Sequence, residues 1–212
     1  MLQPGVTVKD TQAPRRLLRR HLFDVSLALF WILFVWNNFA GFEATHQLGL
    51  ALAVVNESIT VGAFLLRKGP EAVSRAPLDW ALGFSGTLLP TLLRPAYPMD
   101  LSLGTALVSG GFLLHIGALL SLRRSFGIIV AKREIRSGGL YRIVRHPIYA
   151  SGALVYLGYA IANTSWENAA IVVSVSLIFF ARAMREEEFL SSSDEYGRYS
   201  RSTRYRFIPF VY

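Results

Sequence analysis

The chain has 212 residues, of which 52% are hydrophobic and 17% are charged, and its mean hydropathy is +0.37. This composition is too apolar for a soluble domain of this length and predicts an integral membrane protein. The sequence has no cysteine, which excludes disulfides, thiolate metal sites and a catalytic thiol, and we expect no metal ion. The formal net charge of +8 comes from basic residues between apolar runs, so we expect no nucleic-acid partner.

Apolar runs close to the length that a membrane-crossing helix needs, about 20 residues, recur along the chain. They predict an all-α fold with about six transmembrane helices, over residues 22–42, 46–66, 77–93, 101–122, 148–162 and 167–184. Arginines at positions 15, 16, 19 and 20 precede the first run, as in a signal peptide. The run is too long for one and lacks a small-residue cleavage site, so we expect a retained helix.

The basic residues predict the orientation of these helices. If the N-terminus is cytosolic, only Arg94 among the 22 Lys and Arg residues falls on the outer side. This bias places both termini in the cytosol. Only residues 163–166 join the last two helices, which must therefore form an antiparallel hairpin whose open ends face the cytosol. Short loops favour a prokaryotic cytoplasmic membrane.

Polar residues lie deep inside two of the predicted helices: Asn56 and Glu57 are near the centre of the second, and His115 is in the fourth. A carboxylate within a membrane costs several kcal/mol if it is unpaired, and it marks a functional site by default. We favour a structural pair of Glu57 with His115, because small residues suited to helix packing, Ala106 and Gly110, accompany the histidine. A proton pathway would need more ionisable residues than the helices contain.

The turn into the fifth helix carries a first group of candidate residues. Pro147 fits the first helical turn, which leaves His146 at the helix entrance and Tyr149 two residues beyond the proline. Backbone N–H groups at such an entrance can hold an anion. An isolated Arg-His-Pro would more often be a basic loop followed by a helix-starting proline.

An acidic run, residues 186–188, ends the sixth helix, where the helix dipole disfavours carboxylates. A solvated extension with Arg182 and Arg185 as counter-charges would offset that cost. Arg182 and Glu186 are four residues apart and share a face, which the hairpin can place against the turn at His146. A zwitterionic, cationic cofactor would match this arrangement, with its carboxylate at the imidazole and its ammonium at a glutamate.

Together, these motifs resemble the isoprenylcysteine carboxyl methyltransferase family, and the related phospholipid N-methyltransferases share a looser version. The resemblance covers about residues 119–209 and rests on Leu122-Arg-Arg-Ser-Phe-Gly, Gly139-Leu-Tyr-Arg-Ile-Val-Arg-His-Pro-Ile-Tyr149, Glu186-Glu-Glu-Phe-Leu190, Tyr196, Tyr199 and Phe207-Ile-Pro209. One departure is Ser151, which stands beside Gly152 where the family's turn has its small residues.

The resemblance implies that S-adenosylmethionine binds between the last two helices and the loop before them. Glu186 would hold the cofactor's amino group, with Glu187 beside it, and Arg182 would face the methyl acceptor. These roles make Arg182 and Glu186 the expected catalytic residues. The remaining residues expected to line the cofactor are Arg133, Glu134, Ile135, Arg136, Tyr141, His146, Pro147, Ile148 and Tyr149.

We expect the chain to divide into three regions. These are a cytosolic basic N-terminus over 1–21, four helices over 22–122 through which the acceptor reaches the site, and a catalytic region over 123–212. The aromatic and basic tail of the last region would lie at the headgroup level, either as an anchor or as a flap over the site.

The expected function is methyl transfer to a lipid-like acceptor. A carboxylate is ionised at neutral pH and needs only a cation to orient it, for which Arg182 is suited. An amine would need a base, and the candidates are His146, Glu187 and Glu188. We therefore favour O-methylation of a carboxylate on a lipid-like or isoprenoid-bearing molecule. The alternatives are a phospholipid or other lipid amine N-methyltransferase and a non-catalytic transporter or scaffold.

Overall fold

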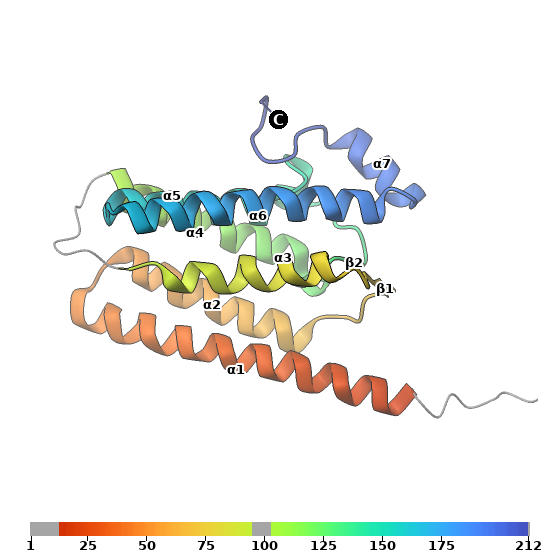
Figure 1. Ribbon diagram of the computed structural model, residues 1–212, viewed down its shortest axis with the longest axis horizontal. Helices are drawn as coiled ribbons and strands as arrows, with labels where there is room; N and C mark the ends of the chain where they lie inside the picture. The colour runs from red at the N-terminus through yellow and green to blue at the C-terminus, as the bar shows by residue number, and fades with distance from the viewer. Residues whose placement is uncertain (1–12, 95–102, 212) are drawn as a thin grey trace, which may run out of the picture.

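The computed structural model describes residues 13–94 and 103–211. It is an all-α integral membrane protein, as predicted, in which the long helices run side by side (Figure 1). Within the described residues, four helices are long and apolar enough to cross a membrane. They are α1 (Ala13–Thr45), α2 (Leu48–Leu66), α4 (Leu103–Leu122) and α6 (Trp166–Leu190). Residues 1–12 of the predicted basic N-terminus and the first two residues of the predicted fourth helix lie outside the described residues.

The other two predicted helices are shorter. Helix α3 (Pro77–Leu88) continues into the 3-10 helix η1 (Leu89–Leu92), and α5 spans Pro147–Ala162. Both α3 and α5 begin with proline. Proline lacks a backbone N–H, but an N–H in the first helical turn has no acceptor within the helix, so no hydrogen bond is lost. At 1.5 Å per residue α5 is about 24 Å long, which is less than the thickness of a typical hydrocarbon core. The hairpin of α5 and α6 is confirmed.

Helices α4 and α5 approach each other through glycines. A Cβ atom on Gly104 would lie 2.5 Å from the Ala162 nitrogen, and one on Gly111 would lie 2.8 Å from the Val155 nitrogen. Larger residues at these positions would force the two helices apart. The prediction that Gly110 serves this packing is wrong, because its Cβ position has no neighbour within 4 Å among the described residues.

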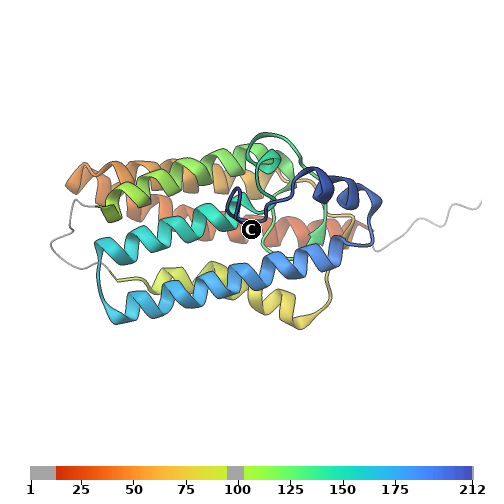
Figure 2. The same cartoon turned by 90° about the horizontal axis from the view of Figure 1, so that it is seen from above.

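The connecting segments converge at one end of the bundle. Strand β1 (Ala72–Val73), which follows α2, pairs antiparallel with β2 (Ala131–Lys132), which follows α4. Helix α7 (Asp194–Ser202) lies at the same end (Figures 1 and 2), where the Tyr199 hydroxyl donates to the Tyr141 carbonyl at 2.9 Å. This end therefore gathers the loops in which most of the basic residues lie.

Two ion pairs tie the helices together near that end. Arg67 after α2 donates to the buried carboxylate of Asp24 in α1. Arg185 of α6 donates to Asp79 in the first turn of α3 at 2.7 Å. Removing one partner from a buried pair leaves the other charge uncompensated, so these contacts fix the relative positions of their helices.

Candidate active site

A cavity of about 370 Å³ opens among the helices and the loop that follows α4. Ten of the twelve predicted site residues line it: Arg133, Glu134, Ile135, Arg136, Tyr141, His146, Ile148, Tyr149, Arg182 and Glu186. Pro147 and Glu187 are not in its wall. Residues from both sides of the α5–α6 hairpin and from the preceding loop thus meet at one cavity.

The loop enters the cavity through a short 3-10 helix, η3 (Gly139–Arg142). Gly139 begins it with a φ of +58°, a conformation that glycine adopts without a steric penalty. Tyr141 follows and is buried, and burial raises the pKa of its phenol well above the usual value, with Glu186 adding to the shift. Tyr141 therefore remains a neutral hydroxyl at physiological pH.

His146 caps the start of α5 and is only 7% exposed. Its ring lies between Tyr149 and Phe207, with centroid distances of 5.7 and 5.6 Å. Its backbone N–H donates to the Arg206 carbonyl at 2.9 Å, so the C-terminal tail already uses that donor. The imidazole is thus held by packing against the tail as well as by its position at the helix entrance.

Glu187 is occupied by three basic groups. Its carboxylate lies 3.1 Å from His146 Nε2, 3.0 Å from Arg145 and 3.1 Å from Arg206. Glu188 points elsewhere: it pairs with Arg185 at 2.6 Å, and its side chain is 69% exposed. The structure therefore gives Glu187 a part in holding His146 and the tail, and it does not bring either glutamate to the cavity as a base.

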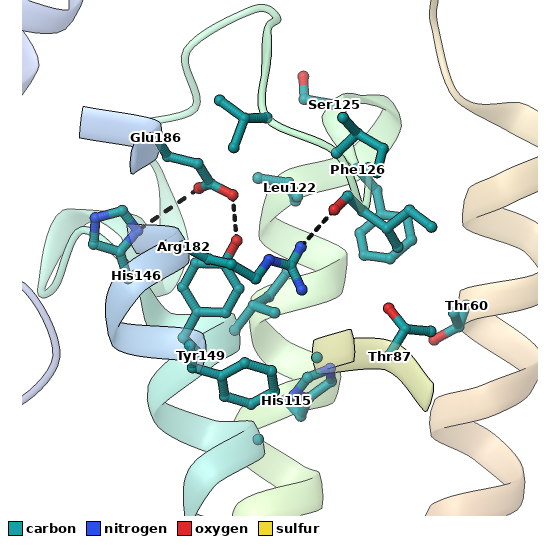
Figure 3. Close-up of a pocket in the computed structure, with 18 of the residues that line it drawn as sticks. Thr60, Thr87, His115, Leu122, Ser125, Phe126, His146, Tyr149, Arg182 and Glu186 are labelled. Atoms are coloured by element: carbon teal, nitrogen blue, oxygen red, sulfur yellow. Dashed lines mark hydrogen bonds and ion pairs between the residues drawn. The ribbon is translucent and has the colours of Figure 1, made fainter. Parts of the chain in front are cut away.

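Glu186 faces the cavity. Its carboxylate accepts a hydrogen bond from the Tyr149 hydroxyl and lies 3.9 Å from His146 Nδ1, as Figure 3 shows. No Lys or Arg in the described residues pairs with it. Two neutral or weakly basic partners leave the anionic charge of Glu186 available to a cationic ligand.

Arg182 lies in the cavity wall and is only 6% exposed. Its Nη2 donates to the Ile128 carbonyl at 2.8 Å, and its guanidinium lies 5.0 Å from the Tyr149 ring centroid (Figure 3). Its Nε is buried without a hydrogen-bond partner, and no carboxylate in the described residues forms an ion pair with it. A buried cation of this kind is costly unless an anion joins it.

Basic side chains of the loop form another part of the wall. Arg133 donates to the Lys68 carbonyl at 3.1 Å, and burial, with Arg67 and Arg20 nearby, lowers its pKa to about 10. Arg136 pairs with Glu134 at 2.8 Å. The Nε atoms of Arg136 and Arg145 are buried and have no hydrogen-bond partner in the described chain. The wall therefore contains N–H donors that a ligand's oxygen atoms can use.

The predicted pair of Glu57 with His115 is wrong. Glu57 accepts two hydrogen bonds from Asn38, at 3.0 and 2.9 Å, and His115 contacts Ser151 at 3.0 Å. Both residues nevertheless line the cavity. These pairings depend on how α1 and α5 are rotated about their own axes, and the sequence did not indicate that rotation.

Residues 99–197 match the phospholipid methyltransferase family model. This match covers just under half of the chain, and it supports an integral membrane methyltransferase. No curated protein matches the chain.

The phospholipid methyltransferase match runs from the start of α4 into α7, so it includes the cavity-lining residues of the loop and of the α5–α6 hairpin. Two parts of the site lie outside it. The tail residues Arg206 and Phe207, which hold His146 in place, follow the match, and the α2 and α3 walls precede it. The sequence indicated a part for the tail, through the motif at Phe207, but not its contacts with His146.

Proposed function

We propose that the protein is an S-adenosylmethionine-dependent methyltransferase that esterifies a carboxylate of a lipid-like or isoprenoid-bearing molecule. The observation that carries the proposal is Arg182, a buried guanidinium in the cavity wall without a carboxylate partner among the described residues. A planar guanidinium binds a carboxylate in a fixed orientation. The match to phospholipid methyltransferases supports the same class of reaction.

The residues present fit the proposed cofactor. Glu186 would hold its ammonium, and the buried donors on Arg136 and Arg145 would serve its carboxylate and ribose oxygens. The bound cofactor supplies a methyl group activated by a sulfonium. Arg182 would orient the acceptor carboxylate, which is already ionised and needs no base, so the protein contributes mainly positioning and exclusion of water.

N-methylation of a lipid amine is the second candidate, because the matching family model is that of phospholipid methyltransferases. A protonated amine needs a base near the reacting atoms. Glu187 is engaged by three basic groups and Glu188 is exposed, so two of the expected bases are poorly placed for this task. This favours the carboxylate.

Methyl transfer itself tests the proposal. The purified chain is incubated with radiolabelled S-adenosylmethionine and a total lipid extract, and the labelled products are then treated with mild base. We expect label in the lipid fraction that base releases as volatile methanol, because a methyl ester hydrolyses to methanol and an N-methyl group stays on its nitrogen. Label that remains non-volatile after base would support the amine instead, and a chain that transfers no label, as a transporter or scaffold would, contradicts both.

We also propose that the loop end of the bundle and both termini face the cytosol, and that residues 22–122 give the acceptor access to the cavity. The one-sided distribution of basic residues supports this orientation. Single cysteines at the exposed positions Ser137 and Thr164, introduced into this cysteine-free chain, should react with an impermeant thiol reagent from opposite sides. Labelling of both from one side would refute the orientation.

A further inference from the structure

The cavity continues beyond the proposed reaction site into the interior of the bundle. Figure 3 shows His115, Thr87 and Thr60 on the far side of Tyr149 and Arg182 from Glu186. Glu57 lines the same cavity and precedes Leu66, the end of α2 nearest the loops, by about 14 Å at the rise of an α-helix. The inner end of the cavity is therefore polar at a depth where lipid-facing residues are apolar.

The two threonine hydroxyls at the inner end have no proton to offer a ligand. Thr60 donates to the Asn56 carbonyl at 2.9 Å, and Thr87 donates to the Gly83 carbonyl at 2.9 Å. A hydroxyl has one proton and two lone pairs, and in both residues the proton is used within the helix. The oxygens of Thr60 and Thr87 are thus left as hydrogen-bond acceptors.

His115 is an acceptor for a related reason. We assign the single proton of the Ser151 hydroxyl to its shortest contact, the Pro147 carbonyl at 2.7 Å, so that its 3.0 Å contact with His115 Nδ1 uses a proton on the imidazole. We assign the neutral tautomer with the proton on Nδ1. This leaves Nε2 as a lone-pair acceptor, and His115 has no other hydrogen bond in the described part of the chain.

Glu57 adds a carboxyl group to this set, and an approaching cation would favour its charged form. Asn38 donates to both of its oxygens, but no Lys, Arg or His in the described residues pairs with it. The side-chain oxygen of Asn56 is buried without a partner. The inner end thus combines a carboxyl group, an imidazole nitrogen and two threonine oxygens that accept hydrogen bonds, and the phenol of Tyr156 lines the same cavity.

We propose that this inner end is a second subsite, which binds a protonated amine on the methyl acceptor. An ammonium has three donors and a charge opposite to that of Glu57, whereas a hydroxyl has one donor and no charge. The inference rests on the proposed function: the acceptor carries a carboxylate, which is methylated at Arg182, and an ammonium deeper in the cavity, which is recognised and not methylated. Glu57 is then a residue that determines acceptor specificity.

The test compares n-octylamine with n-octanol, two probes of equal chain length, by calorimetric titration of the full chain in detergent. We expect the wild type to bind the amine at least about tenfold more tightly, as a charge-assisted hydrogen bond implies. Glu57→Gln should abolish that preference. Glu43→Gln, which removes an exposed carboxylate at the end of α1, should keep it.

A second cavity variant tests the subsite independently, in case Glu57→Gln does not fold. Thr87→Val removes one acceptor oxygen at nearly constant volume and should reduce the preference, while Ser58→Ala, at an exposed serine of α2 with the same kind of internal bond, should not. Equal binding of the two probes by the wild type, or an unchanged preference in both cavity variants, would overturn the subsite. Cofactor affinity on the same preparations tests the proposed function separately, because its loss would not alter the amine preference.

Discussion

Replacing Glu186 with glutamine is expected to weaken the binding of S-adenosylmethionine about ten- to hundredfold. A charge-assisted hydrogen bond to the cofactor's ammonium is worth roughly 1.5–3 kcal/mol, and the amide removes the charge. Glutamine keeps an oxygen that can accept from the Tyr149 hydroxyl, so the surrounding packing should persist. Calorimetric titration of the purified variant in detergent measures the change.

Glu188→Gln is the matched control. This neighbouring carboxylate is 69% exposed, pairs with Arg185 and does not line the cavity. Its removal should leave the cofactor affinity within about twofold of the wild type, since exposed ion pairs contribute little. If both variants bind the cofactor as tightly as the wild type, Glu186 does not hold the ammonium.

Arg182→Lys is expected to lower the single-turnover rate of methyl transfer by about a hundredfold or more while cofactor affinity stays near the wild-type value. Lysine keeps the positive charge but lacks the planar fork that fixes a carboxylate, and a small misplacement of a reactant can cost about a hundredfold in rate. The rate is measured with labelled cofactor and a lipid extract, and the affinity is measured on the same preparation.

Arg185→Lys serves as the comparison, because Arg185 belongs to the same helix and contacts Asp79 and Glu188 outside the cavity wall. It should alter thermal stability more than turnover. An Arg182→Lys variant that only loses stability, with normal turnover, would assign Arg182 to helix packing and remove the proposed anion site.

The hairpin and the residues that meet at its open end were predictable from local sequence. Residues 163–166 are too few to allow anything but an antiparallel return, and the proline at position 147 begins α5 as expected. Arg182 and Glu186 share a helical face, and both line the cavity. These features depend on chain connectivity and helical spacing, which the sequence carries directly.

The role of Glu187 was not predictable, because its partners come from distant parts of the chain. Arg206 reaches it only because the tail runs beside the loop, where Val144 pairs with Tyr205. No helical or strand periodicity marks such a contact.

The partners of Glu57 and His115 also escaped prediction. A charged or polar residue within a membrane helix needs a partner, but the rotation of the helix about its axis selects which one. Here α1 supplies Asn38 to Glu57, and α5 supplies Ser151 to His115. The sequence therefore indicated that Glu57 and His115 need partners but not which residues those partners are.

Titration of the wild-type chain with S-adenosylmethionine measures most directly whether the cavity is a methyltransferase site. We expect saturable binding to one site per chain, and prior addition of S-adenosylhomocysteine, the same molecule without the transferable methyl group, should compete for that site. A folded preparation that shows no saturable binding at millimolar cofactor would contradict the proposed function, since enzymes seldom bind their substrates more weakly.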